Sequence, residues 1–207
     1  VAIYGLAAQL NTYYMSLSTA ISSVFIPRVN RMVSTEDDNK QLTDLFTRVG
    51  RVQFIVLSLI CSGLVLFGKP FIVMWAGHDY VDSSPIALLL IVSVTIPLVQ
   101  NLGIEIQKAK NMHQFRSWVY FFIALGNLVI SIPLTYRYGG FGSALGTAIS
   151  LLIGNGLIMN WYYHYRVGLD MKYFWTEILK FVPSLVLPTI VGIVLTSLVD
   201  IHKLGGF

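Results

Sequence analysis

The stretch SPIALLLIVSVTIPLVQNLGIEIQKAKNMHQFRS, residues 84–117, decides the fold of this chain. From Pro85 to Ile106 it is apolar enough, and at about 1.5 Å per residue long enough, to cross a bilayer. Pro97 lies inside this run and removes one backbone donor, so we expect a kink there. The stretch therefore predicts a bent transmembrane helix.

Polar side chains occupy one side of the same helix. Ser93, Gln100 and Gln107 share one line on a helical wheel, and Asn101 and Glu105 lie beside it. Lipid does not tolerate such a side. It must face either a partner helix or a wet cavity, and a wet cavity is typical of a transporter.

The composition agrees with a membrane protein. The chain has 55% hydrophobic and 12% charged residues and a mean hydropathy of +0.69, whereas soluble domains carry about 25% charged residues. Its net charge is +4, but the basic residues sit between apolar runs. Anionic lipid headgroups, rather than nucleic acid, are therefore the expected partner. We predict an all-α integral membrane protein.

The first segment, residues 1–26, carries a narrow arc of small and polar residues on an otherwise apolar helix. These residues are Gly5, Gln9, Thr12, Ser16, Thr19 and Ser23. Two interpretations stay open. The arc is either a small-residue interface with another helix or the wall of an aqueous cavity.

Further apolar runs at about 52–68, 118–136, 143–163 and 183–199 bring the prediction to about six transmembrane helices. Residues 40–51 and 169–181 are amphipathic and predict interfacial helices. Gly142, Gly146, Ser150 and Gly154 form a ridge that lets another helix approach closely. Asn127 fits an interhelical hydrogen bond or, alternatively, a substrate contact.

Basic residues gather in alternate loops, which sets the expected orientation. Taking the first loop as cytoplasmic places Asn39 in the cytoplasm and Ser83 outside. The basic residues of the first, third and fifth loops are Arg28, Arg31, Lys40, Arg48, Arg51, Lys108, Lys110, Arg116, Arg166, Lys172 and Lys180.

The sequence carries no sign of an enzyme. Paired carboxylates, a histidine with an acid, or a metal-ligand cluster would be needed near the membrane. Most acidic residues lie in predicted loops, and the histidines have no metal-ligand spacing. Glu105 lies one turn from Lys108, which fits an interfacial ion pair. We expect no catalytic residue, no cofactor and no metal site.

Three stretches carry a resemblance to a known family. They are IPLVQNLGIEIQKAKNMHQFRS (96–117), NLVISIPLTYRYGGFGSALGTAIS (127–150) and GNGLIMNWYYHYRVGLDM (154–171). The chain resembles bacterial polysaccharide flippases of the multidrug/oligosaccharidyl-lipid/polysaccharide exporter superfamily.

The resemblance implies two pseudo-symmetric lobes around a central cavity. Residues 1–163 would form most of the second lobe, and residues 164–207 an interfacial helix and a C-terminal extension helix. Because the chain opens directly on an apolar segment without an initiator methionine, we expect it to be a fragment incomplete at both ends.

The function implied is export of an undecaprenyl-pyrophosphate-linked oligosaccharide by alternating access, in a multi-pass protein of the bacterial plasma (inner) membrane. Expected partners are the lipid bilayer, the lipid-linked oligosaccharide, the missing N-terminal lobe and a polysaccharide polymerase, but no nucleic acid. The residues predicted to line the substrate cavity are Gln9, Thr12, Ser16, Ser93, Gln100, Asn101, Glu105 and Asn127.

One feature departs from this expectation. A pyrophosphate wants a basic partner, yet no Arg or Lys lies deep within the predicted spans. The anchoring cation would be in the missing lobe, or be a rim residue such as Arg28 or Arg31. A cation-coupled multidrug antiporter of the same superfamily, and an integral-membrane transferase of lipid-linked glycans, stay as alternative functions.

Overall fold

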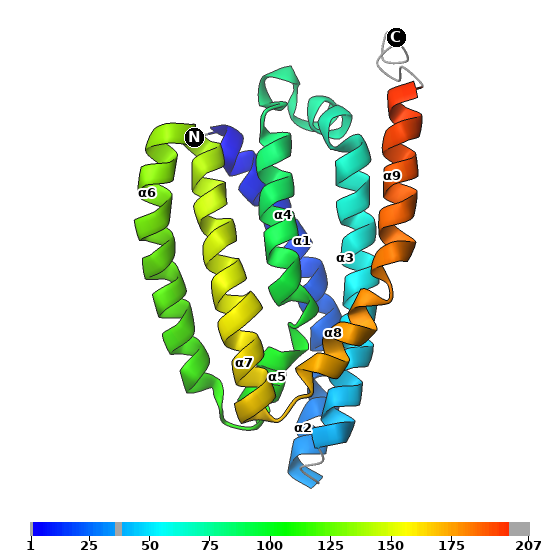
Figure 1. The fold of residues 1–207 in the computed structure, drawn as a ribbon, viewed down its shortest axis with the longest axis vertical. Coiled ribbons are helices and arrows are strands. Elements are labelled where there is room, and N and C mark those ends of the chain that lie inside the picture. The colour runs from blue at the N-terminus through cyan, green and yellow to red at the C-terminus, as the bar shows by residue number, and fades with distance from the viewer. Residues whose placement is uncertain (1, 36–38, 199–207) are drawn as a thin grey trace.

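The computed structural model describes residues 2–35 and 39–198, and these residues form helices and short turns without any strand (Figure 1). The elements are, in chain order, α1 (Ala2–Ser23), α2 (Ile26–Thr35), α3 (Asn39–Ala76), η1 (His78–Tyr80), α4 (Ser83–Val99), α5 (Leu102–Ala109), α6 (His113–Leu151), η2 (Leu152–Met159), α7 (Asn160–Tyr162), η3 (Tyr163–Val167), α8 (Met171–Leu179) and α9 (Val182–Leu198).

The all-α membrane class is confirmed, but the described residues form four candidate membrane-spanning helical segments rather than the six helices predicted. Each segment is long and apolar enough to cross a membrane. They are Asn39–Ala76, Ser83–Ala109, His113–Val167 and Met171–Val194. The helix α1 is not among them, because Gln9, Asn11 and a series of hydroxyl residues lower its hydropathy. In addition, the two runs predicted at 118–136 and 143–163 belong to one helical segment.

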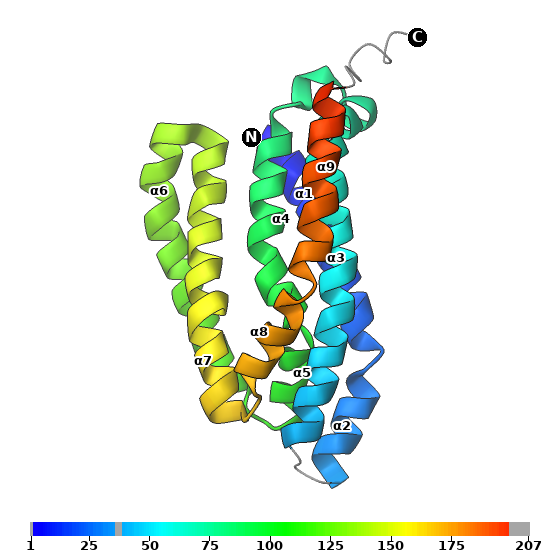
Figure 2. The same cartoon turned by 45° about the vertical axis from the view of Figure 1, so that its right-hand side comes forward.

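That segment reverses direction at Gly139. The backbone of Gly139 has φ 58° and ψ −138°, a conformation open to glycine but strained for other residues. The two arms of this hairpin run side by side (Figure 2), and the small-residue ridge lies between them. A Cβ built on Gly146 would lie 2.1 Å from the Ser131 Oγ of the first arm. The ridge therefore allows the close approach that the sequence predicts.

The helix α4 is the central element of the fold. In the most apolar window of Ser83–Ala109, 61% of the residues are buried, against 17% or less in the other three candidate spans. Around α4 pack α1, α3 and α6. The expected kink is present: α4 ends at Val99, two residues after Pro97, and α5 starts at Leu102. The interruption at 100–101 lies on the C-terminal side of Pro97, whereas the donor that proline lacks would have paired with the Ser93 carbonyl, so the missing donor alone does not account for it.

The helix α8 crosses obliquely over α3 (Figure 1). Asp170 caps it by accepting hydrogen bonds from two backbone N–H groups. The ring of Phe174 stacks on Phe46 with centroids 4.4 Å apart. The Phe174 ring lies over Gly50, and a Cβ added at this glycine would be 2.5 Å from the ring. Glycine therefore allows the close packing of α8 on α3.

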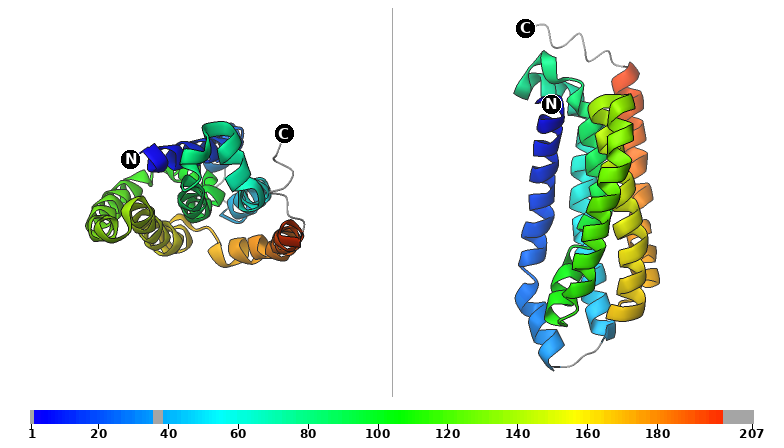
Figure 3. Two further views of the ribbon diagram at one scale, coloured as in Figure 1. Left: turned by 90° about the horizontal axis from the view of Figure 1, so that it is seen from above. Right: turned by 90° about the vertical axis from the view of Figure 1, so that its left-hand side faces the viewer.

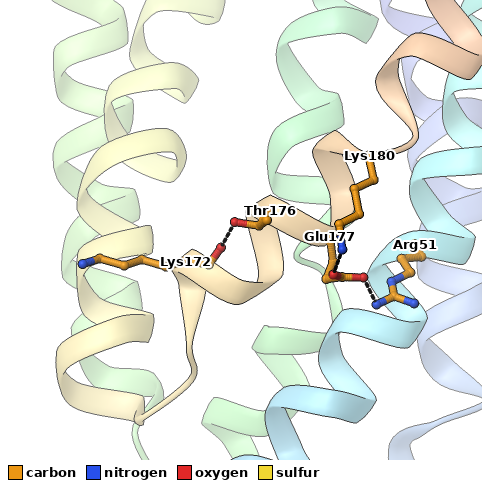
Figure 4. A network of polar contacts seen from close by, with 5 residues as sticks. All are labelled: Arg51, Lys172, Thr176, Glu177 and Lys180. Carbon is orange, nitrogen blue, oxygen red and sulfur yellow. Dashed lines mark hydrogen bonds and ion pairs between the residues drawn. The ribbon is translucent and has the colours of Figure 1, made fainter.

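An ionic contact fixes the far end of α8. The carboxylate of Glu177 pairs with Arg51 of α3 and with Lys180 (Figure 4).

The division of the chain at residue 163 into a lobe and an extension stays a prediction. Residues 199–207 of the predicted extension lie outside the described part of the chain.

The basic loops collect at one end of the molecule. This end holds α2, the start of α3, α5 and the turn after it (Figure 3). The opposite end holds η1 and the hairpin turn at Gly139. The loops that are rich in basic residues in the sequence therefore lie together at one end of the folded molecule.

Candidate substrate cavity

The predicted cavity residues of α1 lie on its uncovered side. Gln9, Thr12 and Ser16 are exposed, whereas the opposite side of α1 is buried. The two hydroxyls bond within their own helix: Thr12 Oγ1 donates to the Ala8 carbonyl at 2.9 Å, and Ser16 Oγ to the Tyr13 carbonyl at 2.7 Å. The outer face of α1, defined by Gln9, Thr12, Ser16, Thr19 and Ser23, is thus polar and open.

The buried side of α1 is held by hydrogen bonds to α3. The side-chain amide of Gln53, fully buried, donates to Ser18 Oγ at 3.0 Å and to Ser22 Oγ at 2.7 Å. Ser18 Oγ in turn donates to the Leu98 carbonyl at 2.8 Å. This contact was not predicted from the sequence. An amide within the apolar run at 52–68 and two serines one turn apart on the first helix nevertheless indicate a hydrogen-bonded helix pair.

A second contact lies nearer the middle of α1. The Tyr14 hydroxyl lies 3.1 Å from the Leu57 carbonyl oxygen and 2.8 Å from Thr95 Oγ1. Together these bonds orient α1 so that its other side faces outward.

The polar line of α4 and α5 has the opposite environment. Ser93, Gln100 and Gln107 are only 4%, 2% and 0% exposed. Ser93 Oγ donates to the Leu89 carbonyl at 2.6 Å, and Gln100 Nε2 donates to Asn160 Oδ1 at 3.2 Å. The same Asn160 oxygen accepts from the Trp175 ring N–H at 2.7 Å. This line packs against the second hairpin arm.

The other three predicted residues lie apart from both regions or at their edge. Asn101 and Glu105 are half-buried, and Glu105 pairs with Lys108 at 2.9 Å as expected. Asn127 Oδ1 accepts from Ser131 Oγ at 2.6 Å, and its amide donates to Thr147 Oγ1 at 3.4 Å across the hairpin. Asn127 therefore makes the interhelical contact that was one of its two interpretations.

A further polar chain near α5 was not predicted. Arg116 donates to the Tyr120 hydroxyl at 2.9 Å, and this hydroxyl donates to Asn155 Oδ1 at 2.9 Å. The Arg116 guanidinium also lies 4.7 Å from the centre of the Tyr120 ring. Within the described residues, neither the Gln107 amide nor Asn155 Nδ2 has a hydrogen-bond partner. Polar groups therefore continue from the α4–α5 line to the hairpin, although not all of them are paired.

The two rim arginines share a hollow at the basic end of the molecule. The hollow has a volume of about 530 Å³ and is lined by Arg28 and Arg31 together with Thr35 and Gln41. Both arginines are exposed. Among the described residues, no cluster of three or more His, Cys, Asp or Glu side chains could hold a metal ion.

Comparison with known proteins gives one informative similarity. The chain is 26% identical over 161 residues to the probable flippase AglR of Haloferax volcanii. The match covers 75% of this chain and 33% of AglR, so the chain spans about a third of the length of this relative. No family model matches the chain, and no solved structure is significantly similar to it.

Proposed function

We propose that the chain is part of a flippase that carries an undecaprenyl-pyrophosphate-linked oligosaccharide across the membrane by alternating access. The observation that carries this proposal is the similarity to a probable flippase over 161 residues. The helical membrane fold supports it, because such a carrier must surround a polar cargo with membrane-spanning helices. In this proposal the protein is a transporter rather than an enzyme.

In this proposal the outer face of α1 forms the cavity wall. The Gln9 side chain is exposed. Moving an amide from water into hydrocarbon without a hydrogen-bond partner costs several kcal/mol, so Gln9 is not expected to face lipid. Water and sugar hydroxyls are suitable partners for it. The missing N-terminal lobe would close the cavity opposite α1.

The arginines of α2 would receive the pyrophosphate. Arg28 and Arg31 lie one turn apart and line the same hollow. Guanidinium groups bind phosphate oxygens through paired, charge-assisted hydrogen bonds. The helices α1 and α2 follow each other along one edge of the molecule (Figure 3), so in this proposal a lipid-linked sugar would find a neutral partner on α1 and a basic one on α2.

The predicted cavity residues on α4, α5 and the hairpin would enter the site only after a conformational change. Ser93 and Gln100 are buried against the hairpin, and Asn101, Glu105 and Asn127 lie near it or within it. The break at 100–101 supplies a point at which α5 can turn relative to α4. In this proposal the hairpin and the bent helix separate in one half of the transport cycle.

The expected setting is the bacterial plasma membrane, with a polysaccharide polymerase receiving the exported glycan. This setting rests on the resemblance of the three sequence stretches, since the relative found is archaeal.

Complementation of a strain lacking the transporter tests the proposal. The full-length protein with Gln9→Leu and Thr12→Val should reach the membrane in normal amount but lose surface polysaccharide and accumulate the lipid-linked precursor. Leu17→Met, at an exposed apolar position of α1, is the control. Normal export by the double variant would remove the outer face from the site, and altered drug resistance with normal export would favour the antiporter.

The orientation is tested separately by cysteine labelling in a Cys61→Ser background. Ser83 is fully buried, so the exposed Asp79 in η1 is the better outside position. An impermeant maleimide on intact cells should label Asp79→Cys but not Asn39→Cys. Labelling of position 39 alone would reverse the orientation.

A further inference from the structure

A second hollow lies at the opposite end of the molecule from Arg28 and Arg31, where three elements meet. The start of α1, the start of α4 and the hairpin turn converge there (Figures 1 and 3). The hollow has a volume of about 530 Å³, within the range of small-molecule sites. Its lining includes Tyr4, Asp82, Pro85, Tyr138 and Phe141.

The lining combines three aromatic rings and one carboxylate with the aliphatic side chains of Ile3, Pro85 and Ile86. Tyr138 and Phe141 are 56% and 40% exposed, and Tyr4 is half-buried. Rings in this situation offer an apolar face and, for tyrosine, a hydroxyl. Such a surface suits a ligand with an apolar face and hydroxyl groups at its edge, which describes a sugar ring.

The carboxylate of Asp82 is not engaged in the fold. Asp82 stands at the N-cap position of α4, but its side chain accepts no hydrogen bond from the helix. By contrast, Asp170 at the start of α8 accepts two, both at 3.1 Å. Within the described residues no ion pair of Asp82 is present either. The carboxylate is therefore available to accept hydrogen bonds from a ligand.

Two of the rings, Tyr138 and Phe141, lie at the hairpin turn. Gly139, with its positive φ, lies next to Tyr138. A Cβ on Gly140 would be 3.7 Å from the Tyr4 Cβ and 3.5 Å from the Ile86 side chain. The turn thus lies close to α1 and α4, which brings side chains from three elements to one hollow.

We propose that this hollow binds a neutral sugar unit. The choice of a sugar rests on the proposed function, in which a glycan is the cargo, whereas the chemistry of the hollow stands by itself. The lining contains Asp82 and no Lys or Arg, so an acidic sugar or a phosphate is disfavoured by charge repulsion. An ammonium headgroup would also suit rings and a carboxylate, but it would fill little of a hollow of this volume.

The two ends of the molecule then have different specificities. The basic end, with Arg28 and Arg31, suits the pyrophosphate, and the aromatic end suits the sugar. A cargo with one charged end and one neutral end would find a separate site for each.

Saturation-transfer NMR on the full-length protein in nanodiscs tests the proposal, with glucose, galactose and N-acetylglucosamine as neutral probes. Glucuronate tests the effect of charge, and choline tests the ammonium alternative. At least one neutral sugar should bind, and Asp82→Ala should weaken it by about tenfold, as expected for loss of a hydrogen bond to a charged group. Glucuronate should bind more weakly than glucose.

Two matched controls lie nearby in the chain. Asp79 and Tyr136 are exposed residues outside the lining, so Asp79→Ala and Tyr136→Ala should bind as the unchanged protein does. Tyr138→Ala should bind more weakly. Thermal unfolding checks each variant, and Asp82→Ala, at an exposed side chain, carries the test if Tyr138→Ala does not fold.

Three results would overturn the proposal: no neutral sugar binds, Asp82→Ala binds as tightly as its control, or choline alone binds. If the unchanged protein does not restore surface polysaccharide but binds a sugar in an Asp82-dependent way, this site stands and the transport proposal is refuted. If the unchanged protein restores export but binds no neutral sugar, the transport proposal stands and this site is refuted.

Discussion

The outer face of α1 and the polar line of α4 and α5 are similar in sequence but opposite in environment. Both consist of amides and hydroxyls spaced along one side of an apolar helix. Gln9 and Thr12 are exposed, and the α1 hydroxyls bond within their own helix. Gln100 is 2% exposed and bonds to Asn160 of another segment.

The difference shows what a helical period can establish. Periodicity identifies the residues that share a side, but not which other element covers that side. Coverage of the α4–α5 line depends on the second hairpin arm, which is far away in the sequence and bonds to Gln100 through Asn160. The outer face of α1 stays open because Gln53 holds the opposite side against α3.

The largest expected effect comes from opening the hairpin. In Gly146→Leu, the new Cβ alone would lie 2.1 Å from Ser131 Oγ and 2.8 Å from its Cα. We expect about 3 kcal/mol of destabilisation through overpacking, seen as less folded protein and a lower melting temperature in detergent.

The matched control is Gly156→Leu, because a Cβ on Gly156 has no neighbour within 4 Å. It should leave the melting temperature nearly unchanged. Equal stability of the two variants would mean that the hairpin arms do not pack through the ridge.

The next effect compares two glutamines with opposite environments. Gln53→Leu removes the amide that donates to the buried hydroxyls of Ser18 and Ser22. The loss should destabilise the protein by about 1–2 kcal/mol. Gln9→Leu should cost nothing measurable, since Gln9 is exposed. Thermal unfolding in one detergent compares both, and a larger loss for Gln9→Leu would refute the assigned orientation of α1.

Gln100→Leu should have a smaller effect on stability. Its bond to Asn160 is lost, but Asn160 Oδ1 keeps the Trp175 donor, so we expect about 1 kcal/mol. Gln100→Leu and Asn101→Leu are nevertheless expected to impair export in the complementation assay while the protein reaches the membrane. Full export by both variants would limit the site to the outer face of α1.

The smallest effect is expected for Glu105→Gln. Lys108 in this pair has a side chain 59% exposed, and such surface pairs contribute about 0–1 kcal/mol. We expect a melting temperature within error of the unchanged protein and nearly normal export. Glu177→Gln, which loses contacts with both Arg51 and Lys180, is the comparison and should be the more destabilising change.

The sequence predicted the helical membrane class, the bend near Pro97, the close approach at the Gly146 ridge and the Glu105–Lys108 pair. These features depend on local composition or on spacing within one segment. It did not predict that α1 is too polar to count as an apolar span, because the polar residues share one arc and the rest of this helix is apolar. Nor did it predict the bonds from Gln53 to α1 or from Gln100 to Asn160. Such contacts join residues far apart in the chain, and one sequence carries no record of which helices become neighbours.

The most direct test of the account is the water accessibility of two positions in the Cys61→Ser protein. Thr12→Cys and Ser93→Cys are treated with a membrane-impermeant maleimide applied to both sides of membrane vesicles. Thr12 is exposed on the outer face of α1, and Ser93 is 4% exposed beneath the hairpin. The account predicts rapid labelling at position 12 and slow labelling at position 93. Protection of position 12, with labelling at position 93, would place α1 against lipid and contradict the proposed cavity wall.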